Sequence, residues 1–215
     1  MTANDFTFTD TSEKLSATLR KLIGKLDGQT ITLRELMASI GEQGLLLVCA
    51  IASLPFLIPV SIPGVSTVFG AAIIMISVAI TLNRMPWLPA RILDKQMQTS
   101  KLLPALEKGV SIVSKLDNYI RPRLPALTGS LFANRINGLA IMAAGILLML
   151  PLGLIPFSNT LPAVAILLFS AGMIQRDGFF VVGGYAFLVL TVVYFSILAY
   201  LAFIAGQGLG GLLAE

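Results

Sequence analysis

The sequence predicts an all-α fold, that of a polytopic helical membrane protein, and two observations predict it. Of the 215 residues, 56% are hydrophobic and only 12% are charged, whereas about a quarter of a soluble domain is charged. In addition, three windows hold no charged residue at all: 43–83, 136–175 and 178–214. Each spans roughly 40 residues, against about 20 for one membrane-spanning helix.

The first two windows are interrupted by prolines, which cannot continue a helix interior. The breaks fall at 54–64, which ends in Pro63-Gly64, and at 150–162. We therefore expect two proline-broken helical hairpins, over 44–83 and 136–176. The third window has no proline from 178 to 206 and predicts one long C-terminal transmembrane helix, with Gly183-Gly184 as its weak point.

The remaining segments carry almost all the charge and divide the chain further. They are the N-terminal region 1–43, the linker 84–135 and the tail 207–215. Basic segments stay cytoplasmic in membrane proteins, which places the N-terminus and the linker inside and the tail outside. Hairpin arms of ~16–18 residues reach only ~25 Å, which is slightly less than the ~30 Å thickness of the hydrocarbon core. Re-entrant hairpins, with their tips inside the bilayer, are therefore an alternative to fully spanning ones.

Amphipathic helices are expected in the two polar regions. Leucines recur with helical spacing at 15, 19, 22 and 26, and a second stripe starts at Leu33. Thr32 and Glu35 form a capping-box pattern that would start this second helix. A third apolar stripe, from Leu103 to Ile120, has a basic opposite face. Such helices lie in the membrane interface or cap the cytoplasmic ends of a bundle.

The two hairpin windows resemble each other, which predicts an internal repeat. Ile-Pro-x-Ser occurs at 58–61 and at 155–158, and the second arms end at Asn83-Arg84 and Gln175-Arg176. By charge, both copies should point the same way. Duplicated units with broken helices are a recurring plan of transporters.

The residue inventory leaves little for catalysis. The chain has no histidine and a single cysteine, Cys49, and none of the three windows contains an acid. We therefore expect no enzyme, no cofactor and no metal site. The net charge of +4 follows membrane topology, so we expect membrane lipid rather than nucleic acid as a partner.

The hairpin tips are the candidate binding site. Helices that restart after the breaks present free N–H groups and a partial positive charge, which suit an oxyanion. Arg84 and Arg176 end matching arms, where they would bind a lipid phosphate or simply anchor the helices at the interface. The tip residues are also what any tight turn requires. The tip set is Ser61, Gly64, Ser66, Thr67, Ser158, Asn159 and Thr160.

Several short motifs, in order, resemble one family. They are Leu-Arg-Glu-Leu at 33–36, Gly-Glu-Gln-Gly at 41–44, Pro55, Pro59, Ile-Pro-Gly at 62–64, and Asn-Arg-x-Pro-Trp-Leu-Pro at 83–89. The chain is similar to the exopolysaccharide synthesis ExoD family of bacterial inner-membrane proteins. The resemblance implies a multi-pass protein of the bacterial plasma membrane, involved in making extracellular polysaccharide and in tolerance of alkaline conditions. It carries over no catalytic residues.

A lipid-modifying enzyme would need an interfacial site built from Glu42, Asp94 or Asp177, and nothing in their spacing favours one. Three other functions remain open. The first is a transporter or flippase for a phosphorylated lipid carrier or related anion. The second is a non-catalytic scaffold or regulator of a polysaccharide synthase complex. The third is an ion/proton antiporter, although such proteins need a buried carboxylate. Small residues at 70–72 and 143–145 allow close helix packing, either within the chain or between two copies. Because five segments make a small transporter, we expect a homodimer.

Overall fold

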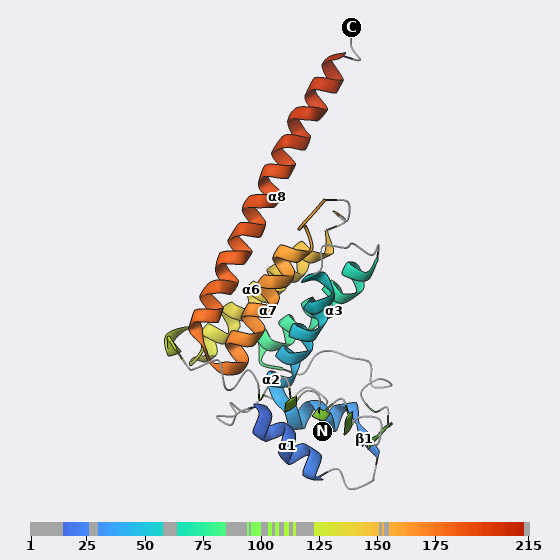
Figure 1. The fold of residues 1–215 in the computed structure, drawn as a ribbon, viewed down its shortest axis with the longest axis vertical. Helices are drawn as coiled ribbons and strands as arrows, with labels where there is room; N and C mark the ends of the chain where they lie inside the picture. The colour runs from blue at the N-terminus through green and yellow to red at the C-terminus, as the bar shows by residue number, and fades with distance from the viewer. Residues whose placement is uncertain are drawn as a thin grey trace.

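The fold is a helical bundle on a small polar base, with one long projecting helix (Figure 1). This computed structural model describes residues 15–25, 30–57, 64–84, 96–99, 123–150 and 155–212, together with Asp94, Leu152 and a few single residues between 103 and 114. Its main helices are α2 (Leu33–Ser53), α3 (Val65–Leu82), α6 (Leu131–Met149), α7 (Thr160–Gln175) and α8 (Gly178–Leu212).

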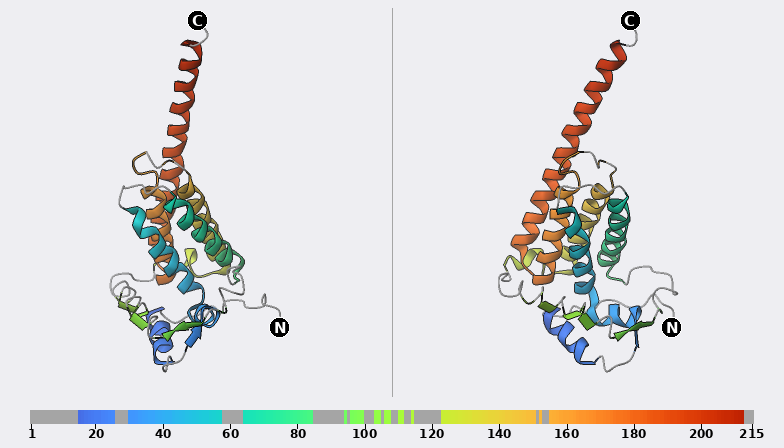
Figure 2. Two further views of the ribbon diagram at one scale, coloured as in Figure 1. Left: turned by 90° about the vertical axis from the view of Figure 1, so that its right-hand side faces the viewer. Right: turned by 45° about the vertical axis from the view of Figure 1, so that its right-hand side comes forward.

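Four of these helices form the bundle as two antiparallel pairs, α2 with α3 and α6 with α7. The pairs interlock, because α3 packs along α6 while α2 packs along α7. Both pairs turn at the same end of the bundle, at the top in Figure 1 and in both views of Figure 2. The internal repeat and its orientation in a membrane stay predictions.

Three described helices are long and apolar enough to cross a membrane: 65–82, 131–149 and 178–205. Two further apolar helices, 41–57 and 160–175, are shorter. The prediction of a helical membrane protein is therefore supported, with two short arms among five apolar segments. Helix α6 begins at Leu131, five residues before the uncharged window, because the Ser130 hydroxyl accepts a hydrogen bond from the Ala133 amide at 3.1 Å.

Helix α8 is continuous, so the expected weak point at Gly183-Gly184 is wrong. These glycines instead permit close packing on α7, since a Cβ at Gly184 would lie 2.8 Å from the Phe169 ring. The helix also extends to Leu212, six residues into the expected tail. Its first half lies against α7, and its second half projects beyond the bundle (Figures 1 and 2).

The base contains α1 (Leu15–Lys25) and the first turns of α2. The predicted capping box is confirmed: the Thr32 hydroxyl accepts from the Glu35 amide at 3.2 Å, and Glu35 Oε2 accepts from the Thr32 amide at 3.0 Å. These bonds favour the carboxylate and lower the pKa of Glu35. Gly41, at φ +64°, then bends the chain between the amphipathic and apolar parts of α2.

One part of the base was not predicted. Strands β1 (Thr30–Thr32) and β2 (Gln96–Gln98) pair antiparallel, and Arg34 Nε donates to Asp94 Oδ1 at 3.0 Å. The all-α prediction thus omitted one short pairing between segments far apart in sequence. Most of the predicted helix over 103–120 lies outside the described residues, although Leu106 is buried.

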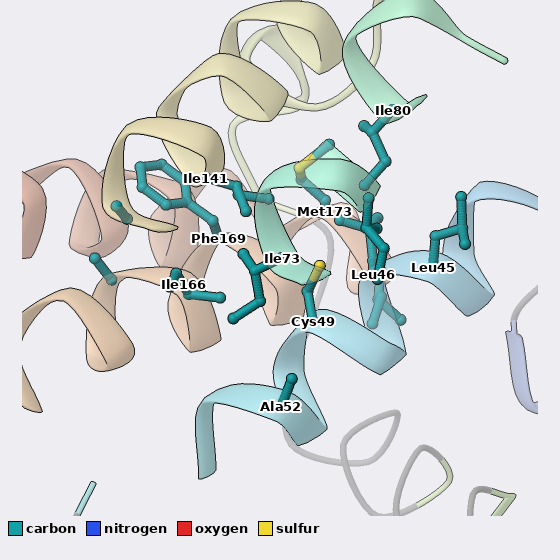
Figure 3. Packing of buried hydrophobic residues seen from close by; sticks show 14 of the residues in the cluster. Leu45, Leu46, Cys49, Ala52, Ile73, Ile80, Ile141, Ile166, Phe169 and Met173 are labelled. Atoms are coloured by element: carbon teal, nitrogen blue, oxygen red, sulfur yellow. The ribbon is translucent and has the colours of Figure 1, made fainter. Parts of the chain in front are cut away.

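The small-residue segments serve packing inside the chain. Gly70 of α3 faces Gly145 of α6, and a Cβ at Gly70 would lie 3.2 Å from the Gly145 carbonyl oxygen and collide with Met149. Branched and aromatic side chains fill the rest of the interior, where Ile73, Ile166 and Cys49 meet near the centre (Figure 3). The homodimer stays a prediction, but these glycines no longer argue for it.

Candidate functional site

The predicted site residues divide between the two ends of the bundle. The tip residues of both pairs lie at the end where the pairs turn, whereas Arg84 and Arg176 follow the opposite ends of α3 and α7 (Figure 1). Helix α3 has 18 residues and separates the two groups by about 27 Å. The structure therefore brings the two tips to a common end and keeps the two arginines apart from them. Ser61 lies outside the described residues.

In the described part of the first tip, the N-cap residue of α3 provides no side-chain acceptor for the helix N–H groups. Gly64 is exposed at φ +82° and begins α3 as its N-cap, without a side-chain hydrogen bond to the first turn. Glycine suits this position because it adopts positive φ without steric cost. Ser66 is half-buried and Thr67 is exposed. Backbone donors and hydroxyls are thus grouped at one helix start, in the arrangement that accepts an anion.

The tip of the second pair is more tightly built. The buried Ser158 hydroxyl lies 2.9 Å from both the Leu152 and the Ile155 carbonyl oxygens, and so it closes the turn. Phe157 is exposed at φ +63°, a costly conformation for a bulky side chain. Ser158 therefore has a structural task here, as the plain-turn interpretation requires. Its neighbours Asn159 and Thr160, at the start of α7, are half-buried.

A hydrogen bond fixes the second tip to α8. The Tyr194 hydroxyl donates to the Pro156 carbonyl oxygen at 2.8 Å. Tyr194 is 16 residues beyond Gly178, the start of α8, which corresponds to about 24 Å along the helix. The position of the tip along α8 is therefore defined.

The two arginines lie at the opposite end, beside matching helix termini. The residues that follow the two helices, Asn83 after α3 and Arg176 after α7, are their C-caps, and both have left-handed backbone conformation. The Arg84 side chain is exposed and Arg176 is half-buried. These cations lie near the carbonyl ends of their helices, where positive charge is favourable.

Sequence reasoning missed a buried polar cluster at this same end. Asn137 is 2% exposed; its Nδ2 donates to the Leu127 carbonyl oxygen at 2.8 Å, and its Oδ1 accepts from the Tyr185 hydroxyl at 2.9 Å. One amide thus joins α6, α8 and the 3-10 turn Pro125–Leu127. The signal was available, since Asn137 is the single amide or charged residue between 136 and 150.

Asp177 is a second buried polar residue that had no assigned role. It is 2% exposed, and its Oδ1 accepts from the Phe179 amide at 2.9 Å, which satisfies a free donor in the first turn of α8. Negative charge is favoured at a helix N-terminus. Asp177 therefore caps the N-terminus of α8.

The described residues include hydrogen-bonding groups at the tips but no cluster of side chains typical of a metal or catalytic site. Among them, no group of three or more His, Cys, Asp or Glu side chains could hold a metal ion. Cys49 is a buried free thiol in the bundle. Across the part of the chain that is described, the arrangement can bind and position a ligand through backbone N–H groups, hydroxyls and arginines.

Comparison with known proteins gives the family. The family described as "Exopolysaccharide synthesis, ExoD" matches residues 15–197. "Protein ExoD" of Rhizobium meliloti is 67% identical over 202 residues, covering 94% of this chain and 84% of the relative. An uncharacterized protein of Synechocystis sp. is 31% identical over 195 residues, covering 90% and 91%. No solved structure is significantly similar. The chain is a member of the ExoD family of exopolysaccharide synthesis proteins.

Proposed function

We propose that this ExoD-family protein moves a phosphorylated lipid carrier, or a related anion, across the membrane during exopolysaccharide synthesis. The observation that carries the proposal is the common position of the two polar tips at one end of the bundle. A tip from each pair would contribute helix N–H groups and hydroxyls to a single anion site. Such a midplane site between broken helices is the usual arrangement in transporters.

The length of α8 supports tips inside the bilayer. Its apolar part, Gly178–Ala205, has 28 residues and is about 42 Å long. The bond from Tyr194 to Pro156 places the second tip about 24 Å along it, a little beyond halfway. If this apolar part spans the membrane with a tilt, the tips end inside the hydrocarbon. We therefore propose that the hairpins are re-entrant.

The charge distribution supports an anion over a cation. The apolar helices described here carry no acidic side chain between residues 43 and 83, 136 and 175, or 178 and 212. The Asp177 carboxylate, just before α8, accepts a hydrogen bond from the Phe179 amide. Arg84 and Arg176 stand at the basal end, where they would attract a phosphate at the membrane surface. The same distribution counts against an ion/proton antiporter.

A scaffold role remains the second candidate, and one observation favours it. Beyond Tyr194, the described part of α8 presents exposed apolar side chains, including Ile197, Leu201 and Phe203. A subunit of a synthase complex could bind there. A scaffold needs no binding site at the polar tips. It is therefore compatible with a Ser158 hydroxyl that only closes the turn of the second tip.

Flux measurement separates the two candidates. Purified protein in liposomes should speed the movement of a fluorescent polyprenyl phosphate from the inner to the outer leaflet, relative to empty vesicles. The double variant Thr67→Val and Thr160→Val keeps the side-chain shapes but removes two tip hydroxyls, and it should lower this rate several-fold.

Ser196→Ala is the matched control, because the Ser196 hydroxyl is exposed on α8 and donates to the Val192 carbonyl oxygen at 2.8 Å. Its rate should equal that of the unmodified protein. A lipid flux no faster than in empty vesicles would refute the transport proposal and leave the scaffold role.

A further inference from the structure

The second arms of the two pairs share backbone features at both ends, with a separation of 93 residues, although α7 begins two residues later than α3 in this register. Positive φ occurs at Gly64 and at Phe157 before the helices, and at Asn83 and Arg176 after them. The hydrogen bonds recur at the same separation: Val68 to Gly64 and Leu161 to Phe157 at the start, then Arg84 to Ala79 and Asp177 to Gly172 at the end. Because the agreement covers both ends of each arm, it shows which residue of α3 corresponds to which residue of α7. The apolar sequences alone leave this alignment ambiguous.

With the same separation of 93 residues, a row of buried side chains on α3 corresponds to a row on α7. Ile73, Ser77 and Ile80 of α3 correspond to Ile166, Ser170 and Met173 of α7. All six side chains are buried, and both serines are 0% exposed. Figure 3 shows the apolar members Ile73, Ile80, Ile166 and Met173 in the central cluster. A buried hydroxyl is therefore placed at the same level of each second arm.

The two hydroxyls differ in their hydrogen bonds. Ser77 Oγ donates to the Ile74 carbonyl oxygen at 2.8 Å, the usual solution for a buried helical serine. Ser170 Oγ is buried and has no hydrogen-bond partner. The buried hydroxyls of Ser53 and Thr191 also bond to their own helices. Because an unpaired buried hydroxyl destabilises a fold, Ser170 calls for an explanation other than packing.

We propose that Ser170 and Ser77 line a water-accessible path through the bundle, which carries the hydrated head group of an anion between the tips and the basal end. Water, or an oxygen of the passing head group, supplies the partner that Ser170 lacks. Arg84 and Arg176 follow the basal ends of the same two arms. The path rests on the proposed transport function for its cargo, but its hydration can be tested without measuring transport.

Thiol labelling tests the path directly, because the chain has one cysteine. In a Cys49→Ala background, Ser170→Cys and Ser77→Cys are exposed to an anionic, water-soluble methanethiosulfonate reagent in liposomes. The control Ala165→Cys is on the same helix and equally buried at 0%, but it lies roughly 140° around the helix from Ser170. Both serine positions should react at least several-fold faster than Ala165→Cys.

Equal, slow reaction at all three positions would overturn the path, even if lipid flux is observed. Fast reaction at the serine positions without lipid flux would support the path and refute the cargo. The two proposals therefore fail separately.

A second variant separates function from packing at Ser170. Ser170→Ala removes an unpaired hydroxyl, so the melting temperature of the purified protein should stay the same or rise. Exopolysaccharide production by a deletion strain carrying this variant should nevertheless fall several-fold. Full production at an unchanged or higher melting temperature would show that Ser170 is only a packing residue.

Discussion

At the scale of single residues, some polar side chains of the bundle hold the structure, and others are available for the proposed function. Asn137 belongs to the first group, since both ends of its amide are bonded, to Leu127 and to Tyr185. Ser158 also belongs to it through its two carbonyl contacts. Thr67 is exposed at its tip, and Ser170 is buried without a bond. Function is therefore expected at the second pair of residues.

Asn137→Leu should destabilise the protein while keeping the branched arrangement of four side-chain heavy atoms. The change leaves the Leu127 carbonyl and the Tyr185 hydroxyl without their partner, which costs about 1–3 kcal/mol of unfolding free energy. Denaturant unfolding in detergent measures this loss. Tyr185→Phe removes only one of the two bonds and should cost less. An Asn137→Leu protein as stable as the unmodified one would contradict the assigned role.

At the scale of elements, close approach of helices is set by individual glycines. Helices α3 and α6 meet at Gly70 and Gly145, and α7 and α8 meet at Gly184. Gly183, next to it, faces a looser contact, since its Cβ would lie 3.4 Å from Leu168 Cδ1. Adjacent glycines in one helix thus have different roles, which depend on the face that each occupies.

Substitution of these two neighbours by alanine should have unequal effects. Gly184→Ala places a methyl group 2.8 Å from the Phe169 ring, and such overpacking costs about 1–3 kcal/mol. Gly183→Ala meets only an ordinary contact and gains helix propensity, so its stability should be unchanged or slightly higher. Thermal unfolding of the two purified variants compares them. Equal melting temperatures would refute the close contact between α7 and α8.

At the scale of the whole molecule, one hydrogen bond relates the second tip to the apolar length of α8. The Tyr194–Pro156 bond fixes the second tip part-way along the apolar length of α8. The short helices 41–57 and 160–175 are consistent with arms that do not cross the full bilayer. The proposed re-entrant depth of the second tip therefore rests on the apolar length of α8.

Spin labels in the Cys49→Ala background should report this depth. A label at Phe157, which is 55% exposed at the tip, should be accessible to oxygen and shielded from a water-soluble nickel complex. A label at Leu212, the last residue of α8, should show the opposite preference. If the Phe157 label instead prefers the nickel complex, the tip lies in water and the hairpins are not re-entrant.

The sequence by itself determined the membrane class, the two interrupted hairpins, the long last helix and the capping box, because hydropathy, proline and capping chemistry act locally. It also pointed to Ser66, Thr67, Asn159 and Thr160 as tip residues. Only the tertiary structure decided how the pairs interlock, which glycines are contacts, and that Ser158 closes its own turn. The helix packing and the glycine contacts depend on residues far apart in the chain, such as Gly70 with Gly145 and Tyr194 with Pro156, which no local pattern records. The Ser158 bonds are local, but they depend on the backbone geometry of the turn, which the residue types alone do not specify.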